Sequence, residues 1–272
     1  MRYARPSWAL SLLAALCAVP CTHASAQVEP TDDEAQEAPT PSTAPRAPWS
    51  LSLAAGLGAG SRELDLPRDG VVYQVRSGLF PAVELGFELS HDLSQDFTLG
   101  LLARYQTSLG LALVEKLTDG SEHSRSTRSH HLELGLAPTL RLDAQGRWAL
   151  AAAVGFHVSE LDPEAHLITP SYFMSGPFLR VELQLPLASD RVRLRIGPEA
   201  QWIAQVGREL LDRGIRAGGL GAGGSATLEL ALARHWTVAA SYRELRSWLD
   251  SSQASSFVDV SRFVTARLSG TL

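Results

Sequence analysis

The chain has 272 residues, with 24 basic and 29 acidic side chains and a formal net charge of −5. This acidic balance argues against a nucleic-acid partner, because phosphate backbones are bound by basic surfaces. Its only two cysteines, Cys17 and Cys21, lie within the first 26 residues. Disulfide bonds therefore do not hold the rest of the chain together.

The N-terminal segment 1–26 has the three parts of a secretory signal peptide. Arg2 and Arg5 supply positive charge, residues 8–19 are mostly apolar, and residues 24–26 (Ala-Ser-Ala) form a small-residue cleavage site. A short membrane anchor is the alternative, but the apolar stretch is too short to span a bilayer comfortably. We therefore predict export and cleavage after residue 26.

Residues 27–48, QVEPTDDEAQEAPTPSTAPRAP, are rich in proline and acidic side chains and have almost nothing to bury. This composition predicts a disordered, acidic, Pro-rich leader. From Trp49 onward the composition changes, yet no run of 18 apolar residues follows. If the exported chain enters a membrane, it must do so as strands.

Ten segments between residues 49 and 272 alternate apolar and polar side chains, which is the period of a β-strand. They lie near 49–60, 79–90, 97–113, 131–142, 148–159, 173–187, 192–206, 222–233, 236–243 and 258–272.

The connections between these segments alternate in length. The first is long (SRELDLPRDGVVYQVRSG, 61–78), the second is short (HDLSQD), and the alternation continues to the last. Long connections on one side and tight turns on the other predict an even-stranded antiparallel meander. Ten strands fit best, and eight is the nearest alternative.

The apolar faces of three segments begin and end with aromatic residues, at Phe97 and Tyr105, Trp148 and Phe156, and Trp236 and Tyr242. Such runs cover roughly 20 Å of tilted strand, close to the lipid-facing band of a membrane barrel with its aromatic girdles. Along the apolar faces of all ten segments, taken in chain order, the first charged residue is Arg262. The pattern therefore indicates a lipid-facing wall.

The last segment, SRFVTARLSGTL, keeps its alternation up to Leu272. In water it would be an exposed sheet edge, whereas in a closed barrel it pairs with the first strand. This strand resembles the C-terminal assembly signal of bacterial outer-membrane β-barrel proteins, although that signal usually ends in an aromatic residue. The resemblance covers residues 49–272 at the level of architecture.

The resemblance implies an all-β fold, an antiparallel up-and-down transmembrane β-barrel of the small, porin-like class. It also implies a place in the outer membrane of a Gram-negative-type envelope, with periplasmic termini and extracellular long loops. The expected partners are outer-membrane lipid and, through the C-terminal strand, the barrel-assembly machinery.

Four prolines lie where the pattern predicts continuous strands, although a proline removes a ladder hydrogen bond. They are Pro81, Pro138, Pro177 and Pro198, all on the lipid-facing parity. We expect bulges at these points, or strands shorter than the pattern suggests.

The polar face is charged and balanced, which predicts a charge network in the lumen. Its members are Glu84, Glu88, Arg104, Glu133, Arg141, Arg180, Glu182, Arg193, Arg195, Glu199, Glu229 and Arg243. Folding the hairpins on their tight turns sets Glu84 opposite Arg104, in the register that pairs Glu88 with Gly100. It also sets Arg180 opposite Glu199, or Glu182 opposite Arg195 one register over. Such a network either plugs the lumen or lines a narrow pore.

His157, Ser159 and Glu160 are the candidates for catalysis, as base, nucleophile and orienting acid. They faintly resemble the lipid A deacylases of the outer membrane, but those enzymes have eight strands and a lipid-facing site. The polar rim of a barrel explains these residues equally well.

Outer-membrane proteases of the ten-stranded type carry clustered aspartates and an Asp–His couple in their outer loops. Here the corresponding residue types are scattered through predicted loops, as Asp65, Asp69, Asp119, Asp212 and His166. Without clustering, we interpret them as solvated loop residues.

Metal and cofactor sites are not predicted. His123, His130 and His131 lack a fixed fourth ligand, and the loop GLGAGGS (219–225) lacks the lysine and helix of a phosphate-binding loop. The sequence favours a non-enzymatic barrel with a plugged lumen and outward recognition or structural loops. A narrow channel for small solutes and an outer-membrane hydrolase are the alternatives. No ligand can be named.

Overall fold

The computed structural model describes residues 49–116, 120–143, 147–164, 168–187, 191–252 and 255–272. The predicted signal peptide and leader lie outside the described residues. The described part forms a single antiparallel sheet of 13 strands and one short helix. The elements are β1 (Trp49–Arg68), β2 (Val71–Ser77), β3 (Phe80–Asp92), β4 (Phe97–Ser108), β5 (Leu111–Lys116), β6 (Glu122–Arg141), β7 (Ala149–Pro163), β8 (Tyr172–Pro186), β9 (Val192–Ile203), β10 (Gln205–Val206), α2 (Arg208–Asp212), β11 (Gly219–Ala233), β12 (Trp236–Leu249) and β13 (Phe257–Thr271).

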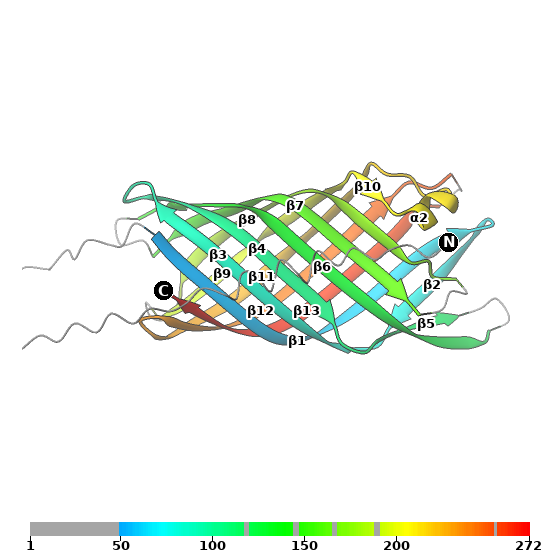
Figure 1. The fold of residues 1–272 in the computed structure, drawn as a ribbon, viewed down its shortest axis with the longest axis horizontal. Coiled ribbons are helices and arrows are strands. Elements are labelled where there is room, and N and C mark those ends of the chain that lie inside the picture. The colour runs from blue at the N-terminus through cyan, green and yellow to red at the C-terminus, as the bar shows by residue number, and fades with distance from the viewer. Residues whose placement is uncertain (1–48, 117–119, 144–146, 165–167, 188–190, 253–254) are drawn as a thin grey trace, which may run out of the picture. The chain divides into compact units, whose positions relative to one another are not determined.

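Ten of these strands close into a ring in the order β1–β3–β4–β6–β7–β8–β9–β11–β12–β13 and back to β1. The closing ladder between β1 and β13 runs from Ser52 opposite Thr271 to Asp65 opposite Val258. Figure 1 shows the strands crossing the barrel wall at a steep tilt. The predicted ten-stranded, antiparallel up-and-down barrel is confirmed. The last strand, β13, pairs with the first strand, β1, as expected for a closed barrel.

The first predicted long loop is wrong, because residues 61–78 are mostly strand. β1 continues to Arg68, turns at Asp69 and Gly70 with φ of 51° and 78°, and returns as β2. The third predicted connection, residues 114–130, likewise holds the end of β5 and the start of β6, and these two strands pair with each other. β2 and β5 then pair side by side, so the wall continues past the ends of β3 and β4. These strands lie at the end of the barrel opposite the C-terminus (Figure 1).

The helix α2 follows β10 at the same end of the barrel (Figure 1). Its Leu210 is completely buried, while Leu211 is half exposed. Among the described residues, no helix has the length and apolar content needed to cross a membrane.

The outward face of the ring carries an apolar belt. Leu57, Leu101 and Val154 are 70%, 53% and 46% exposed, values that an interior side chain would not show. Trp148 and Trp236 lie at the edge of the belt nearest the C-terminus and are also exposed. Because lipid tails solvate such a surface and water does not, the belt is the lipid-facing wall predicted from the alternation.

The four strand prolines coincide with missing ladder pairs. Pairing between β6 and β7 skips Pro138 and resumes without a shift of register, and the β8–β9 ladder skips Pro198 in the same way. Pro81 and Pro177 lie one residue outside the start of the β3–β4 and β8–β9 ladders. Local breaks in the ladder without a shift of register, and not the expected bulges, accommodate the missing N–H groups.

The interior of the barrel end formed by β2, β5, β10 and α2 is apolar. We call this cluster the apolar cap; it comprises Leu64, Leu66, Val75, Phe80, Leu111, Leu113, Leu161, Ile168, Tyr172, Met174, Ile203, Val206, Leu210, Ile215, Leu249 and Phe257. All of these side chains are buried. One end of the lumen is therefore filled by a core of the kind found in soluble proteins.

Candidate functional site in the barrel lumen

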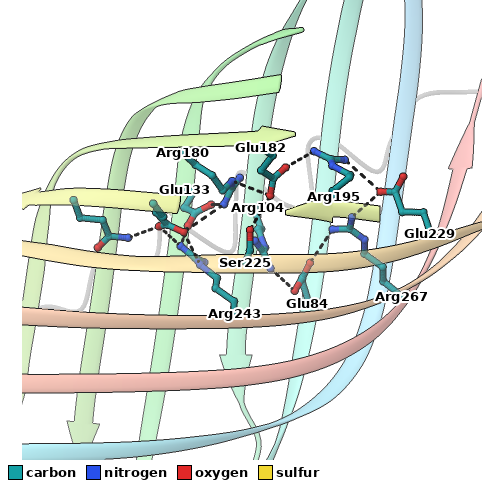
Figure 2. Close-up of polar contacts among 12 residues, drawn as sticks. Glu84, Arg104, Glu133, Arg180, Glu182, Arg195, Ser225, Glu229, Arg243 and Arg267 are labelled. Carbon is teal, nitrogen blue, oxygen red and sulfur yellow. Dashed lines mark hydrogen bonds and ion pairs between the residues drawn. The ribbon is translucent and has the colours of Figure 1, made fainter. Parts of the chain in front are cut away.

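Five arginines and five glutamates form a continuous chain of ion pairs across the middle of the lumen (Figure 2). We call it the lumen network; its members are Glu84, Arg104, Glu133, Arg180, Glu182, Arg195, Glu199, Glu229, Arg243 and Arg267. They come from eight ring strands and project inward because each lies on the polar parity of its strand. The charges of the network cancel.

One arm of the network starts at the β3–β4 hairpin. Arg104 Nη2 donates to Glu84 Oε2 at 2.8 Å, and Arg267 Nη1 lies 3.6 Å from Glu84 Oε1. Arg267 also reaches Glu229 at 3.5 Å, and Arg195 reaches the same carboxylate at 3.3 Å. Arginine can bridge two carboxylates in this way because its guanidinium presents several N–H groups in one plane.

Glu182 joins this arm to the deeper part of the network. Arg195 Nη2 donates to Glu182 Oε2 at 2.7 Å, and Ser225 Oγ donates to Glu182 Oε1 at 2.9 Å. Arg180 Nε lies 3.8 Å from the same carboxylate. Both oxygens of Glu182 therefore have partners, as a buried carboxylate requires.

The deepest part is centred on Arg243, which bridges Glu133 and Glu199. Its Nε donates a hydrogen bond to Glu199 Oε2 at 2.9 Å, and its Nη2 donates one to Glu133 Oε1. Arg180 Nη1 donates to Glu133 at 3.2 Å, and His131 Nε2 lies 2.9 Å from the same carboxylate. The side chains of both glutamates are 0% exposed. Two such carboxylates stay charged next to each other because Arg243 and Arg180 both lie against the pair.

Small inward residues on β1 and β7 give the network room. The inner face of β1 presents Gly56 and Gly58, and that of β7 presents Ala151 and Ala153. A Cβ on Gly58 would lie 2.2 Å from the backbone oxygen of Val264. This position therefore requires glycine.

Nine of the twelve residues predicted for the lumen network belong to it. Arg141 instead pairs with Asp92 at 3.0 Å near the short turns, while Glu88 and Arg193 form no ion pair within the described part of the chain. Arg267 was missed, although it lies on the polar parity of the last strand.

The predicted hairpin registers had different outcomes. Glu84 lies opposite Gln106, two positions from the predicted Arg104, and Glu88 lies opposite Leu102 in place of Gly100. The Arg104 side chain still reaches Glu84 diagonally. Opposite Glu199 the structure places Arg180, as the first of the two predicted registers requires.

A second buried polar group lies between the lumen network and the apolar cap, at the seam where the ring closes. We call Arg62, Ser129, Tyr172 and Asp259 the seam cluster. Arg62 donates to Asp259 through Nε at 3.0 Å and to Ser129 Oγ at 2.6 Å, and Tyr172 OH donates to Asp259 at 2.8 Å. Because Arg62 is on β1 and Asp259 on β13, the cluster joins the first and last strands. Sequence reasoning missed it, since Arg62 fell in a predicted loop.

The predicted catalytic residues are not brought together. His157 is 1% exposed and lies opposite Glu133, with its ring 6.1 Å from that of His131. Ser159 lines a small internal cavity of about 30 Å³ above Arg243, room for one or two water molecules. Glu160 is exposed and lies on the opposite parity of β7, so it cannot orient His157.

The residues considered for protease or metal chemistry are also dispersed. Asp65 lies on the outer face of β1, Asp69 in the β1–β2 turn and Asp212 at the end of α2, while Asp119 and His166 lie outside the described residues. His130 accepts or donates a hydrogen bond with Tyr105 at 2.8 Å on the outer face of the wall, away from the inward-facing His131. Within the described ranges, no three His, Cys, Asp or Glu side chains are arranged to hold a metal ion.

Solved structures with a similar fold are outer-membrane β-barrel proteins. The outer-membrane protease OmpT from Escherichia coli matches with a TM-score of 0.51 and 12% identity, over 82% of this chain and 96% of that one. An outer-membrane channel from Pseudomonas putida F1 matches with a TM-score of 0.42 and 10% identity, over 90% and 100%. The β-domain of the Bordetella autotransporter BrkA matches with a TM-score of 0.40 and 10% identity, over 81% and 98%.

No protein-family model and no curated protein matches the chain. The closed ring of ten strands, the apolar belt and the likeness to OmpT give this chain the fold of an outer-membrane β-barrel protein. At such low identity the likeness shows the fold alone.

Proposed function

We propose that this protein is a closed, non-enzymatic barrel whose lumen does not conduct and whose strand-built end serves recognition or a structural role at the cell surface. The apolar cap is the observation that carries the proposal. A pore needs a continuous water path, and sixteen buried apolar side chains fill the lumen at one end.

The exposed fractions of the side chains in the lumen network also indicate that the lumen is closed at the end with the apolar cap. The side chains of Arg195 and Arg267 are 27% and 20% exposed, whereas those of Glu133 and Glu199 are 0% exposed. Solvent therefore enters from the end with the short turns and stops at the deeper ion pairs. Each network charge is matched by an opposite charge, which leaves little free field to attract a permeating ion.

The orientation of the barrel in the membrane follows from the different lengths of the connections at its two ends. In outer-membrane barrels the short turns face the periplasm and the longer connections face outward. We therefore place both barrel termini in the periplasm, and the β1–β2 and β5–β6 hairpins with α2 outside the cell. These hairpins continue the barrel wall as paired backbone, so they offer a rigid outer surface to a partner.

Neither alternative function has comparable support. A hydrolase of the deacylase type needs a carboxylate that orients His157. Glu160 points away from His157, and Glu133, which lies opposite it, is already held by Arg180, Arg243 and His131. A narrow channel needs a route past the apolar cap, whose sixteen side chains are all buried.

Conductance of the refolded protein in a planar bilayer tests the proposal. The heat-dependent shift in gel mobility first confirms that the barrel is folded, and a conducting barrel added afterwards confirms that the bilayer detects pores. We expect no discrete current steps from the folded protein. Reproducible steps that appear only with the folded form would overturn the proposal and establish the narrow channel.

A further inference from the structure

The small cavity above Arg243 lies across the lumen, at the level between the lumen network and the apolar cap. We call it the inner cavity. Its volume is about 30 Å³, which is room for one or two water molecules. The side chains that line it come from eight of the ten ring strands, namely β1, β4, β6, β7, β8, β9, β12 and β13. The inner cavity is therefore a layer of the lumen itself and is surrounded by the barrel wall.

Both charged groups of the lumen reach the inner cavity. Arg62, Ser129 and Asp259 of the seam cluster line one part of it, and Arg243 of the lumen network lines another. The two arginines are 3% and 5% exposed. Arg62 is paired with Asp259, and Arg243 is paired with two glutamates. Because these charges are already compensated, the inner cavity does not favour a free ion.

One side chain of the lining has a hydrogen-bond donor to spare. Gln106 is 3% exposed, and its Nε2 has no hydrogen-bond partner among the described residues. A buried amide N–H without an acceptor is destabilising. The amide of Gln106 therefore requires an acceptor in the inner cavity.

The rest of the lining offers further partners to the same acceptor. Ser159, Ser247 and Ser261 line the inner cavity from three different strands, and Gln201 lines it from β9. Hydroxyl and amide groups both donate and accept hydrogen bonds. Apolar cavities of proteins stay dry, whereas a buried water molecule typically makes about three hydrogen bonds to polar groups. The inner cavity has the size and the polar groups that such a water molecule needs.

We infer that the inner cavity binds water, which accepts a hydrogen bond from Gln106 and bridges the seam cluster to the lumen network. The bound water gives the buried charges a polar layer directly beneath the apolar cap. It also makes the two charged groups one hydrogen-bonded unit across the seam where the ring closes. This inference rests on the closed lumen proposed above, because in an open lumen the same side chains would face bulk water.

Met174 provides a direct readout of the bound water. It lines the inner cavity and is 3% exposed, and the only other methionine of the chain is Met1. A short X-ray pulse splits water into hydroxyl radicals, which oxidise a methionine that touches a bound water molecule. The folded barrel is irradiated in lipid vesicles, and the oxidised fraction of Met174 is measured by mass spectrometry.

Leu113→Met supplies the matched control within the same molecule. Leu113 is a 0% exposed member of the apolar cap, and leucine-to-methionine changes are well tolerated in cores. We expect Met174 to be oxidised about tenfold more than the introduced methionine, because only Met174 touches water. Equal oxidation of the two would overturn the inference.

Two further variants alter the inner cavity itself. Gln106→Leu removes the unsatisfied amide, and Ser159→Val fills space on β7 opposite Met174. Each should lower the oxidation of Met174 by about threefold or more, since the water loses a partner or its room. The heat-dependent shift in gel mobility shows which variants are folded. Unchanged oxidation in the folded variants would overturn the inference.

Chloramine-T, an oxidant dissolved in the bulk water, separates this inference from the proposed function. We expect it to leave Met174 reduced, because the closed lumen keeps it out. If Met174 resists both chloramine-T and the X-ray pulse, the inner cavity is dry, and the inference fails while the closed lumen stands. If both treatments oxidise Met174, the lumen is open to bulk water, and the inference and the proposed function fail together.

Discussion

Two stretches of strand β1 place their leucines on opposite sides of the same wall. Leu57 points outward and is 70% exposed, whereas Leu64 points inward and is 0% exposed. The residues next to these leucines face the opposite way: Gly58, beside Leu57, faces the lumen, and Glu63, beside Leu64, faces out. The difference shows that a continuous strand changes its apolar face where its surroundings change from lipid to water.

The strands at the other side of the seam behave in the same way. On β12, Tyr242 faces out and Arg243 faces in, yet further along Arg246 faces out and Leu249 is buried inside. Within the membrane the barrel is apolar outside and polar inside, and beyond it the order is that of a soluble protein. Lumen network and apolar cap are thus two cores of opposite polarity in one barrel.

The two cores should respond differently to substitution, and Arg243→Gln should have the largest effect. It removes the arginine that bridges Glu133 and Glu199 and leaves only Arg180, 3.2 Å from Glu133 and 3.9 Å from Glu199, beside these two buried carboxylates, which costs about 3–5 kcal/mol. The free energy of unfolding in urea, measured with the barrel in lipid vesicles, gives the cost directly. Arg193→Gln removes a lumen arginine without an ion pair and should change this free energy by about 0.5 kcal/mol or less. Equal effects of the two variants would contradict the network.

The second substitution compares the two leucines of β1. Leu64→Ala removes buried methyl groups and leaves a cavity in the apolar cap, so we expect a loss of about 2–5 kcal/mol. Leu57→Ala loses only the transfer of its side chain into lipid, about 1–2 kcal/mol, because lipid tails refill the space. If Leu57→Ala cost more in the same urea assay, the apolar cap would not be a packed core.

The smallest of the three effects should come from the seam cluster. Ser129→Ala removes the hydrogen bond that Ser129 Oγ accepts from Arg62 and leaves the ion pair with Asp259 intact, and we expect a loss of about 1–2 kcal/mol. Tyr172→Phe removes one hydrogen bond to the same carboxylate and should cost about 1 kcal/mol. A cost near zero for both would show that the closing strands do not need the cluster.

Alternation within the membrane belt was enough to predict the ring of ten strands and most of the lumen network, because one parity stays apolar from Trp236 to Tyr242. It failed where the parity reverses. Leu64 and Leu66 still alternate with Glu63 and Asp65, but on the other face, and this reversal looks like the end of a strand. The hairpins, the apolar cap and Arg62 were therefore missed together.

The register between the two strands of a hairpin was the other feature that could not be predicted from the sequence. Strand register depends on turn geometry, and a shift of two residues keeps every side chain on its own face. Glu84 could therefore be assigned to the lumen while its cross-strand neighbour was assigned wrongly. Long arginine side chains then reach a carboxylate from either register, so the ion pair with Arg104 survives the error.

The most direct test of the account is the accessibility of spin labels placed one at a time at Leu57 and Leu64, with the barrel in lipid vesicles. Collisions with oxygen report lipid, and collisions with a water-soluble nickel complex report water. The account predicts high oxygen and low nickel accessibility at Leu57, and low accessibility to both at Leu64. High nickel accessibility at Leu64 in a folded barrel would mean an open, water-filled lumen, and the closed barrel would have to be abandoned.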